Sequence, residues 1–585
     1  MPIYFDRPNL VTRDEAQAPS MWLRAEPDTR EIAWETVSEA RVERPRRHDL
    51  RLNLAAFGAF LALALVMQIW VGAYRTERGN FPDEAGHFMN GMLVRDYLTD
   101  GLGENPMQFA RQYYLNYPKI APGMWPPLYH GLLGIFLLPG WPPETAALFL
   151  IGLATAWTGW RLFRILSLLT TRRLAFAIAA VFLCTPVIVN LSSAVMLDIV
   201  VAAFALEATY WLALFVGSGD WRHAAMYGLV AAGGCLTKGN GLAILLMPAL
   251  VAIFARRLDL FRRPGLYLAA AIVLLVAAPL VTMSFYFDAT IGDFRVTTWA
   301  DVITRTKFYA WYLTVQLGLP FLAIGAVGLV AAITSPRTER HAGPAMGPSL
   351  AALVVAATLF HLLNPHAVYS GRYMTLSVAP MFGLLPIGFR SLLGAIRWPG
   401  WRGPARVALV GALIWSAFLI APMLAIRLPL GFRDAASFLN STVGLAGHRF
   451  MVVSEENGEG AFVTEIAGRH PEPPATVFRA SKIMATDTWG GHDFRLRYDS
   501  AAALMKELEN LHVEYIAVDE SLAANNHPLW NPTRDLLETQ ANRLERRYAA
   551  TGARPVVLYR LKYRSPGPPT APQMKISSPL GQWQR

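Results

Sequence analysis

Two acids and a histidine stand close together in "NFPDEAGHFMNGMLVRDYL", residues 80–98. Asp83 and Glu84 are adjacent, and His87 follows four residues after Asp83, on the same face of a helix. A carboxylate can act as a general base, and an Asp/His pair can contribute to a divalent-cation site. The simpler interpretation is an acidic first turn of a helix, favoured by the helix dipole. Two ligands are few for a metal, so a cation at Asp83 and His87 is left open.

Two further ionisable residues lie in apolar surroundings, where a charge at the centre of a membrane span costs roughly 3 kcal/mol. Asp198, in "SSAVMLDIVVAAF", either begins a helix or shares one site with Asp83 and Glu84, and the shared site is favoured. Lys238, in "LTKGNGLAILLMP", either snorkels at a helix end or binds a phosphate from a glycine-rich turn. Spacing alone leaves both interpretations of Lys238 open.

Arg372 and Tyr373 lie in "NPHAVYSGRYMTLSVAP". They are either anchors at the membrane interface or a guanidinium and a ring that hold an anionic head group. Glu207 lies within an apolar run and is expected to form an interhelical hydrogen bond or to be protonated. His361 and His366 are interpreted as structural, and the glycines of "SEENGEGAF" as a tight strand-to-helix turn.

The composition of the chain indicates a membrane protein. Of 585 residues, 54% are hydrophobic and 16% charged, against about 25% charged in soluble proteins. The net charge of +11 falls in short loops between apolar runs, which is the positive-inside pattern and not a nucleic-acid footprint. Both cysteines lie in predicted spans, so no disulfide framework is expected. We predict a multi-pass protein of a bacterial-type inner (plasma) membrane, in contact with membrane lipids; its oligomeric state is not determined.

Basic residues before the first apolar run place the N-terminus in the cytoplasm and the Asp-Glu pair outside, and no cleavable signal peptide is visible. The segment 128–138 is bounded by prolines and too short to cross ~30 Å, so we expect a juxtamembrane or re-entrant helix. Eleven spans, an odd number, put the C-terminal region outside. They are predicted near 52–74, 144–164, 174–190, 197–216, 224–237, 241–255, 266–287, 311–333, 350–363, 373–393 and 406–427.

Four regions follow from the change of pattern along the chain. They are a cytoplasmic segment 1–50, a membrane domain 51–430 with a large first external loop and juxtamembrane helices, an extracytoplasmic domain 431–563 and a disordered tail 564–585. The third region alternates strand and helix patterns, which predicts a small α/β domain. The tail is proline-rich.

The motifs, in their order, resemble a known family. The Asp-Glu pair after the first span is followed by "WPPLYHGLLGIF" at 125–136, "VMLDIVVAAF", "LTKGNGLAILLMP" and "GRYMTLSVAP". Over about residues 50–430 the chain resembles the C-type superfamily of membrane glycosyltransferases. The group it is most similar to contains the protein O-mannosyltransferases and the lipid A aminoarabinose transferases.

The resemblance implies a donor sugar on a polyprenyl-phosphate carrier such as undecaprenyl phosphate, used at the outer face of the membrane. The acceptor would be a protein, lipid A or another glycan. By motif, Asp83 and Glu84 match the acids of the reaction centre, and Asp198 matches the later membrane aspartate. The role of the external domain is not implied by the resemblance, and acceptor docking is our own hypothesis for it.

The resemblance further implies that Lys238, Arg372 and Tyr373 bind the donor. Relatives often carry Lys or His before Pro-Pro where this chain has Trp125, so Lys119 in "NYPKIAPG" is the nearest candidate replacement. We include Lys119 and His87 among the expected substrate-binding residues.

The expected reaction is an inverting transfer in which Asp83 is the general base and the cations stabilise the leaving phosphate. Two other classes fit part of the pattern. A polytopic transporter would also carry intramembrane charges, although we find no repeated halves. A non-catalytic envelope scaffold would use the acid pair only to begin a helix.

Overall fold

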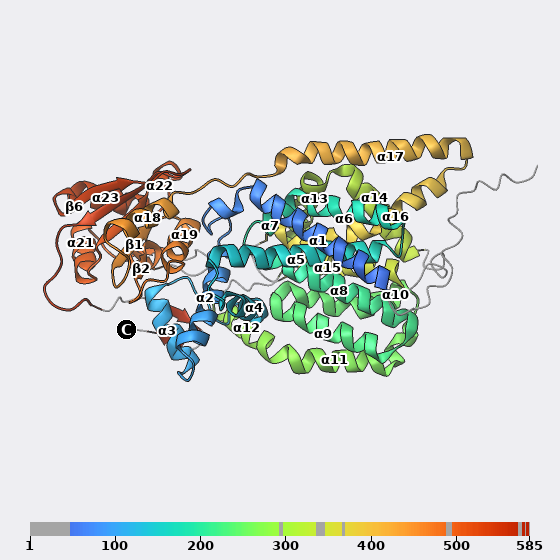
Figure 1. Ribbon diagram of the computed structural model, residues 1–585, viewed down its shortest axis with the longest axis horizontal. Helices are drawn as coiled ribbons and strands as arrows, with labels where there is room; N and C mark the ends of the chain where they lie inside the picture. Colours follow the sequence, from blue (N-terminus) through green and yellow to red (C-terminus); the bar gives the residue numbers. More distant parts are fainter. Residues whose placement is uncertain are drawn as a thin grey trace, which may run out of the picture.

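A computed structural model describes residues 47–291, 297–334, 345–364, 369–486, 494–570, 576–578 and 581–583. A helical bundle is followed by a smaller α/β domain, which packs at one end of the bundle beside helices α2 and α3 (Figure 1). The predicted cytoplasmic segment lies almost wholly outside the described residues, as does His366. The whole is a polytopic membrane protein, as the composition predicts.

The bundle contains the following helices. They are α1 (Arg47–Trp70), α2 (Glu84–Asp100), α3 (Pro106–Asn116), α4 (Leu128–Leu137), α5 (Pro143–Leu166), α6 (Arg172–Leu183), α7 (Pro186–Ser192), α8 (Leu197–Ser218), α9 (Trp221–Thr237), η2 (Gly239–Leu246), α10 (Met247–Phe254), α11 (Pro264–Val276), α12 (Ala278–Ile291), α13 (Trp299–Leu317), α14 (Leu319–Thr334), α15 (Met346–Leu363), η4 (Gly371–Met374), α16 (Thr375–Ala395) and α17 (Pro399–Ile420), with short 3₁₀ turns η1 (Ala73–Arg75), η3 (Leu258–Arg262) and η5 (Ala421–Met423).

Among the described residues, six helices are long and apolar enough to cross a membrane: most of α1, then α5, α8, α15, η4–α16 and α17. Three bent helix pairs raise that number to as many as nine, with bends of 66° in α6–α7, 52° in α11–α12 and 115° in α13–α14. The segments predicted as spans 224–237 and 241–255 form α9 and η2–α10, which fall short of 18 residues. The number of eleven spans therefore stays a prediction.

The spans predicted at 174–190 and 311–333 are each formed by a bent helix pair, and the sequence explains the breaks. Pro186 begins α7, and the residue before it is extended because a proline ring disfavours a helical predecessor. Gly318 ends α13 at φ 80°, a left-handed backbone that favours glycine, and Pro320 follows without an N–H to donate. Helix α4 is a 10-residue apolar helix, too short to span, as predicted.

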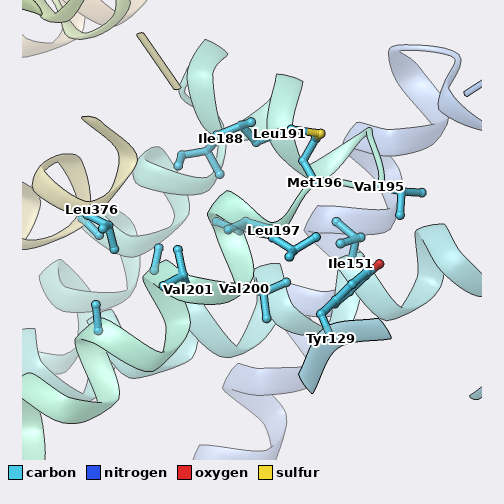
Figure 2. Packing of buried hydrophobic residues seen from close by; sticks show 14 of the residues in the cluster. Tyr129, Ile151, Ile188, Leu191, Val195, Met196, Leu197, Val200, Val201 and Leu376 are labelled. Carbon is cyan, nitrogen blue, oxygen red and sulfur yellow. The ribbon is translucent and has the colours of Figure 1, made fainter. Parts of the chain in front are cut away.

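The start of α8 lies at the centre of the bundle core. Leu197, Val200 and Val201 pack among side chains of α4, α5, α7 and α16, including Tyr129 and Leu376 (Figure 2). Every residue from Leu197 to Ala203 is buried. Because packed interiors resist displacement, this core fixes the first turn of α8, which carries Asp198.

The α/β domain is built on a five-stranded sheet of order β2-β1-β5-β7-β6. Strands β2, β1 and β5 are parallel to one another, and β7 pairs antiparallel with both of its neighbours, β5 and β6. Its elements are α18 (Phe432–Thr442), β1 (Arg449–Val453), α19 (Glu456–Ala467), β2 (Thr476–Arg479), α20 (Ala480–Ile483), β3 (Ala485–Thr486), β4 (Arg495–Leu496), α21 (Ala501–Asn510), β5 (Tyr515–Asp519), α22 (Ser521–Ala524), α23 (Trp530–Thr539), η6 (Ala541–Arg543), β6 (Leu544–Ala549) and β7 (Val556–Leu561). Within the predicted disordered tail, β8 (Ile576–Ser578) and β9 (Gly581–Trp583) instead pair as an antiparallel ribbon.

A buried carboxylate joins the domain to the bundle. Glu77, in the loop between α1 and α2, accepts hydrogen bonds from the backbone N–H groups of Leu430, Gly431 and Arg433 at 2.7, 3.0 and 2.9 Å. These N–H groups open helix α18, where an anion is favoured by the helix dipole. The same loop leads into α2, so the domain is attached next to the Asp-Glu pair.

Candidate active site

Asp198 and Lys238 form one ion pair of the site. Asp198 is in the first turn of α8 and is almost fully buried. Lys238 ends α9 in an extended conformation before the glycine-rich 3₁₀ segment η2. Its Nζ donates to both carboxylate oxygens of Asp198, at 2.8 and 2.9 Å. A buried charge needs such a partner, so each residue explains the other's presence in apolar surroundings.

Asp83 and Arg372 form a second ion pair. Asp83 immediately precedes α2, and Arg372 lies in the 3₁₀ turn η4 that opens the span of α16. Nη2 of Arg372 donates to Oδ2 of Asp83 at 2.5 Å. The Asp83 side chain keeps 22% of its surface exposed, so it stays within reach of a ligand.

Tyr373 connects the two ion pairs. Nζ of Lys238 lies 5.2 Å and Cζ of Arg372 lies 5.4 Å from the centroid of its ring. Cations over an aromatic ring are attracted by its quadrupole. Residues from four distant stretches of sequence, Asp83, Asp198, Lys238 and Arg372–Tyr373, therefore meet in one place. This is the arrangement that the resemblance implies.

Several buried polar atoms around this place have no hydrogen-bond partner among the described residues. They are Nε and Nη1 of Arg372, Nε2 of His87, Oδ1 of Asn240 and both ring nitrogens of His361. The His361 ring stacks on Tyr373 at 5.5 Å. Buried polar groups in proteins are nearly always paired, so these atoms are left as potential partners for a polar ligand.

Glu84 has partners outside the two ion pairs, so its expected place with Asp83 at a reaction centre stays a prediction. Its carboxylate is fully buried and meets Nη2 of Arg427 at 3.1 Å and Nη1 of Arg78 at 3.7 Å. It also accepts from the backbone N–H groups of Asn80 at 2.9 Å and Val195 at 3.2 Å. Adjacent helical residues point about 100° apart, which explains how two neighbouring acids enter different surroundings.

Lys119 also lies elsewhere than expected. It is fully buried at the contact between the bundle and the α/β domain, where its Nζ pairs with Glu456 of α19 at 3.3 Å. Burial lowers the pKa of its ammonium group, and the charge of Arg479 lowers it further. The structure thus places Lys119 in domain docking, and its role in substrate binding stays a prediction.

His87 faces His130 and Trp125. Its Nδ1 lies 3.2 Å from Nε2 of His130, and its ring centroid lies 4.4 Å from that of Trp125. In the described part of the chain, no group of three or more His, Cys, Asp or Glu side chains is arranged to hold a metal ion. Metal binding by Asp83 and His87 stays a prediction.

Glu207 forms the interhelical contact that its position predicts. It pairs with Arg161 of α5 and accepts from the indole N–H groups of Trp157 at 3.1 Å and Trp211 at 2.8 Å. The residues that sequence reasoning missed are His130, Arg427 and Glu77. His130 lies within the motif "WPPLYHGLLGIF", which is the one signal that pointed toward it.

Helix α19 touches the start of α2 so closely that a methyl group added at Gly460 would lie 2.8 Å from Cβ of Ala85. We expect Gly460→Ala to shift α2 and to lower kcat about tenfold, because small misplacements of catalytic groups are costly. The double variant Gly460→Ala/Ala85→Gly removes the closest clash and should restore most of the turnover, while the side chain of Lys119, whose Cε lies 3.0 Å from the added methyl group, must still shift slightly. Gly131→Ala on α4, which has open space, is the control. Normal kcat and thermal stability in Gly460→Ala would contradict this contact.

Comparison with known proteins supports the same family. A family model described as Dolichyl-phosphate-mannose-protein mannosyltransferase matches residues 126–282. No curated protein matches the chain. Among solved structures, ArnT from Cupriavidus metallidurans bound to undecaprenyl phosphate is 14% identical with a TM-score of 0.52, covering 86% of this chain and 97% of that chain.

A second similar structure is the oligosaccharyltransferase of Archaeoglobus fulgidus in complex with Zn and sulfate. It is 12% identical with a TM-score of 0.50, covering 85% of this chain and 73% of that chain. At such identities the likeness shows the fold. The chain has the fold of the C-type superfamily of membrane glycosyltransferases and, as its motifs predict, resembles the mannosyltransferase and ArnT group within it.

Proposed function

We propose that the chain is an integral-membrane glycosyltransferase. It moves a sugar from a polyprenyl-phosphate carrier to an acceptor at the extracytoplasmic face of a bacterial-type plasma membrane. The observation that carries the proposal is the meeting of Asp83–Arg372 and Asp198–Lys238 around the ring of Tyr373. The acceptor class is a hydroxyl or an amine of a protein, lipid A or glycan.

In this mechanism the phosphate of the donor binds between Lys238 and Arg372. Arg372 has two buried nitrogens without a partner among the described residues, so it can hold a phosphate oxygen while keeping its contact with Asp83. As the sugar–oxygen bond breaks, the phosphate gains a second negative charge. The two cations stabilise that developing charge in surroundings of low dielectric.

Asp83 is the general base of the proposal. The acceptor oxygen or nitrogen attacks the anomeric carbon, its proton passes to the Asp83 carboxylate, and polyprenyl phosphate leaves from the opposite face. A single displacement of this kind inverts the anomeric configuration. Asp198 fixes the position of Lys238 beside the phosphate, since its two oxygens accept hydrogen bonds from the ammonium group.

A charge-neutral double variant tests the phosphate site. Removing Lys238 alone would leave Asp198 buried and unpaired, so we use Lys238→Met with Asp198→Asn. We expect the KM for a synthetic polyprenyl-phosphate sugar to rise on the order of ten- to a hundredfold, as for a lost hydrogen bond to a charged group. The measurement is radiolabelled sugar transfer by the purified chain in detergent.

The matched control is Arg257→Met with Asp259→Asn, which removes a surface ion pair in the short turn after α10 together with the exposed contact of Asp259 with Arg263. That pair is half exposed, so its removal should change neither KM nor thermal stability. An unchanged KM in the Lys238/Asp198 variant would overturn the proposed phosphate site.

A further inference from the structure

His87 is held in one orientation by three contacts. Its backbone N–H donates to the carbonyl oxygen of Asp83 at 2.9 Å, which places it one helical turn after that residue. Its ring packs against the rings of Trp125, with centroids 4.4 Å apart, and His130, with centroids 5.5 Å apart, and those two rings also lie 6.1 Å from each other. The side chain is completely buried. A ring so confined presents its two nitrogens in fixed directions.

The two ring nitrogens of His87 have different surroundings. Nδ1 shares a hydrogen bond of 3.2 Å with Nε2 of His130, whereas Nε2 is buried without a partner among the described residues. Where Nε2 of His130 carries the proton, it donates to Nδ1 of His87, and Nε2 of His87 then carries the free N–H. An unpaired donor in a buried site is costly unless a ligand accepts from it.

The place of His87, one helical turn after the carboxylate that holds Arg372, indicates that ligand. Burial holds the pKa of His87 well below its usual range, and His130, Lys238 and Arg372 lower it further. Burial likewise lowers the pKa of His130 to about 3. Both rings are therefore neutral at physiological pH. His87 follows Asp83 by one helical turn, and Asp83 is held by Arg372, a proposed phosphate ligand. We therefore place the phosphate on the face of α2 that Asp83 and His87 share.

We propose that His87 is a third ligand of the donor, whose Nε2–H donates to an oxygen of the carrier's phosphate, and that His130 is a positioning residue that fixes the ring and tautomer of His87. This inference rests on the proposed function and adds a neutral donor to its two cations. A neutral donor binds the anion without adding positive charge to a site where each cation already has a carboxylate partner.

Paired amide substitutions test the proposal because each amide reproduces one ring nitrogen. Asn in place of His87 keeps a polar group near Nδ1, and Gln reaches the position of Nε2. We expect His87→Asn to weaken binding of undecaprenyl phosphate to the full chain in detergent about tenfold, and His87→Gln to recover most of that loss. His130→Ala should weaken binding as well, and His130→Gln should partly restore it.

Controls separate this inference from the proposed function. His223→Asn alters a histidine that contacts Ser218 and the ring of Trp211 beyond the far end of α8, and it should leave binding unchanged. Equal binding by His87→Asn and the unaltered chain, or equal losses in the Asn and Gln variants, would overturn the role of His87. Failure of the unaltered chain to bind undecaprenyl phosphate would overturn both proposals. If only the Lys238/Asp198 variant lost binding, the proposed function would be supported and His87 would not be a ligand of the phosphate.

Discussion

Replacing Asp83 by Asn is expected to lower sugar transfer by a factor of about 10²–10⁴, the usual contribution of a general base. The amide has the shape of the carboxylate and retains an oxygen for Nη2 of Arg372, but it cannot take a proton from the acceptor. Asp83 makes no side-chain capping bond to α2 and is partly exposed, so the fold should tolerate the change. Single-turnover transfer by the purified chain measures the loss.

The matched control for this variant is Asp220→Asn. Asp220 caps α9 by accepting from the N–H of Arg222, and Asn caps helices as well as Asp does. Both variants should keep the thermal stability of the unaltered chain, and Asp220→Asn should keep its turnover. Binding of undecaprenyl phosphate should persist in Asp83→Asn, because Lys238 and Arg372 remain. Near-normal turnover in Asp83→Asn would remove Asp83 from the role of base.

The sequence predicts the charged centre well because each of its members is conspicuous. Asp198 and Lys238 interrupt apolar runs, where an ionisable residue needs a function or a partner. Arg372 and Tyr373 begin a span in a motif that resembles a known family. The structure brings these residues together with Asp83, and their mutual pairing supplies the reason that each is tolerated.

What the sequence does not predict depends on contacts between distant segments. Glu84 meets Arg427, which lies 343 residues later, and Lys119 meets Glu456, which lies 337 residues later. No local pattern encodes such pairs. The bends in α6–α7 and α13–α14 are different, because Pro186 and Gly318 are visible in the sequence. Hydropathy alone treats those runs as straight spans, since it measures apolar length and not backbone direction.

Replacing Glu84 by Gln is expected to cost about 3–5 kcal/mol of stability, as for a buried ion pair that loses one partner. The backbone N–H groups of Asn80 and Val195 bind different oxygens of the carboxylate, so the single oxygen of the amide can accept from only one of them. Arg427 and Arg78 also lose the negative charge between them. Arg427 also donates to the carbonyl oxygen of Ser193, so its displacement would disturb the turn before α8. The measurement is the thermal unfolding midpoint in detergent.

We thus expect the two neighbouring acids to have different roles, Asp83 in the reaction and Glu84 in the stability of the fold. Asp83→Asn should keep its unfolding midpoint and lose turnover, whereas Glu84→Gln should lose stability and keep turnover per folded molecule at low temperature. Glu84→Gln leaves the buried charge of Arg427 without its carboxylate partner. The double variant Glu84→Gln/Arg427→Met removes that charge, so it should be more stable than Glu84→Gln alone. A Glu84→Gln protein with a normal midpoint and no turnover would instead place Glu84 in the reaction, despite its burial among the arginines.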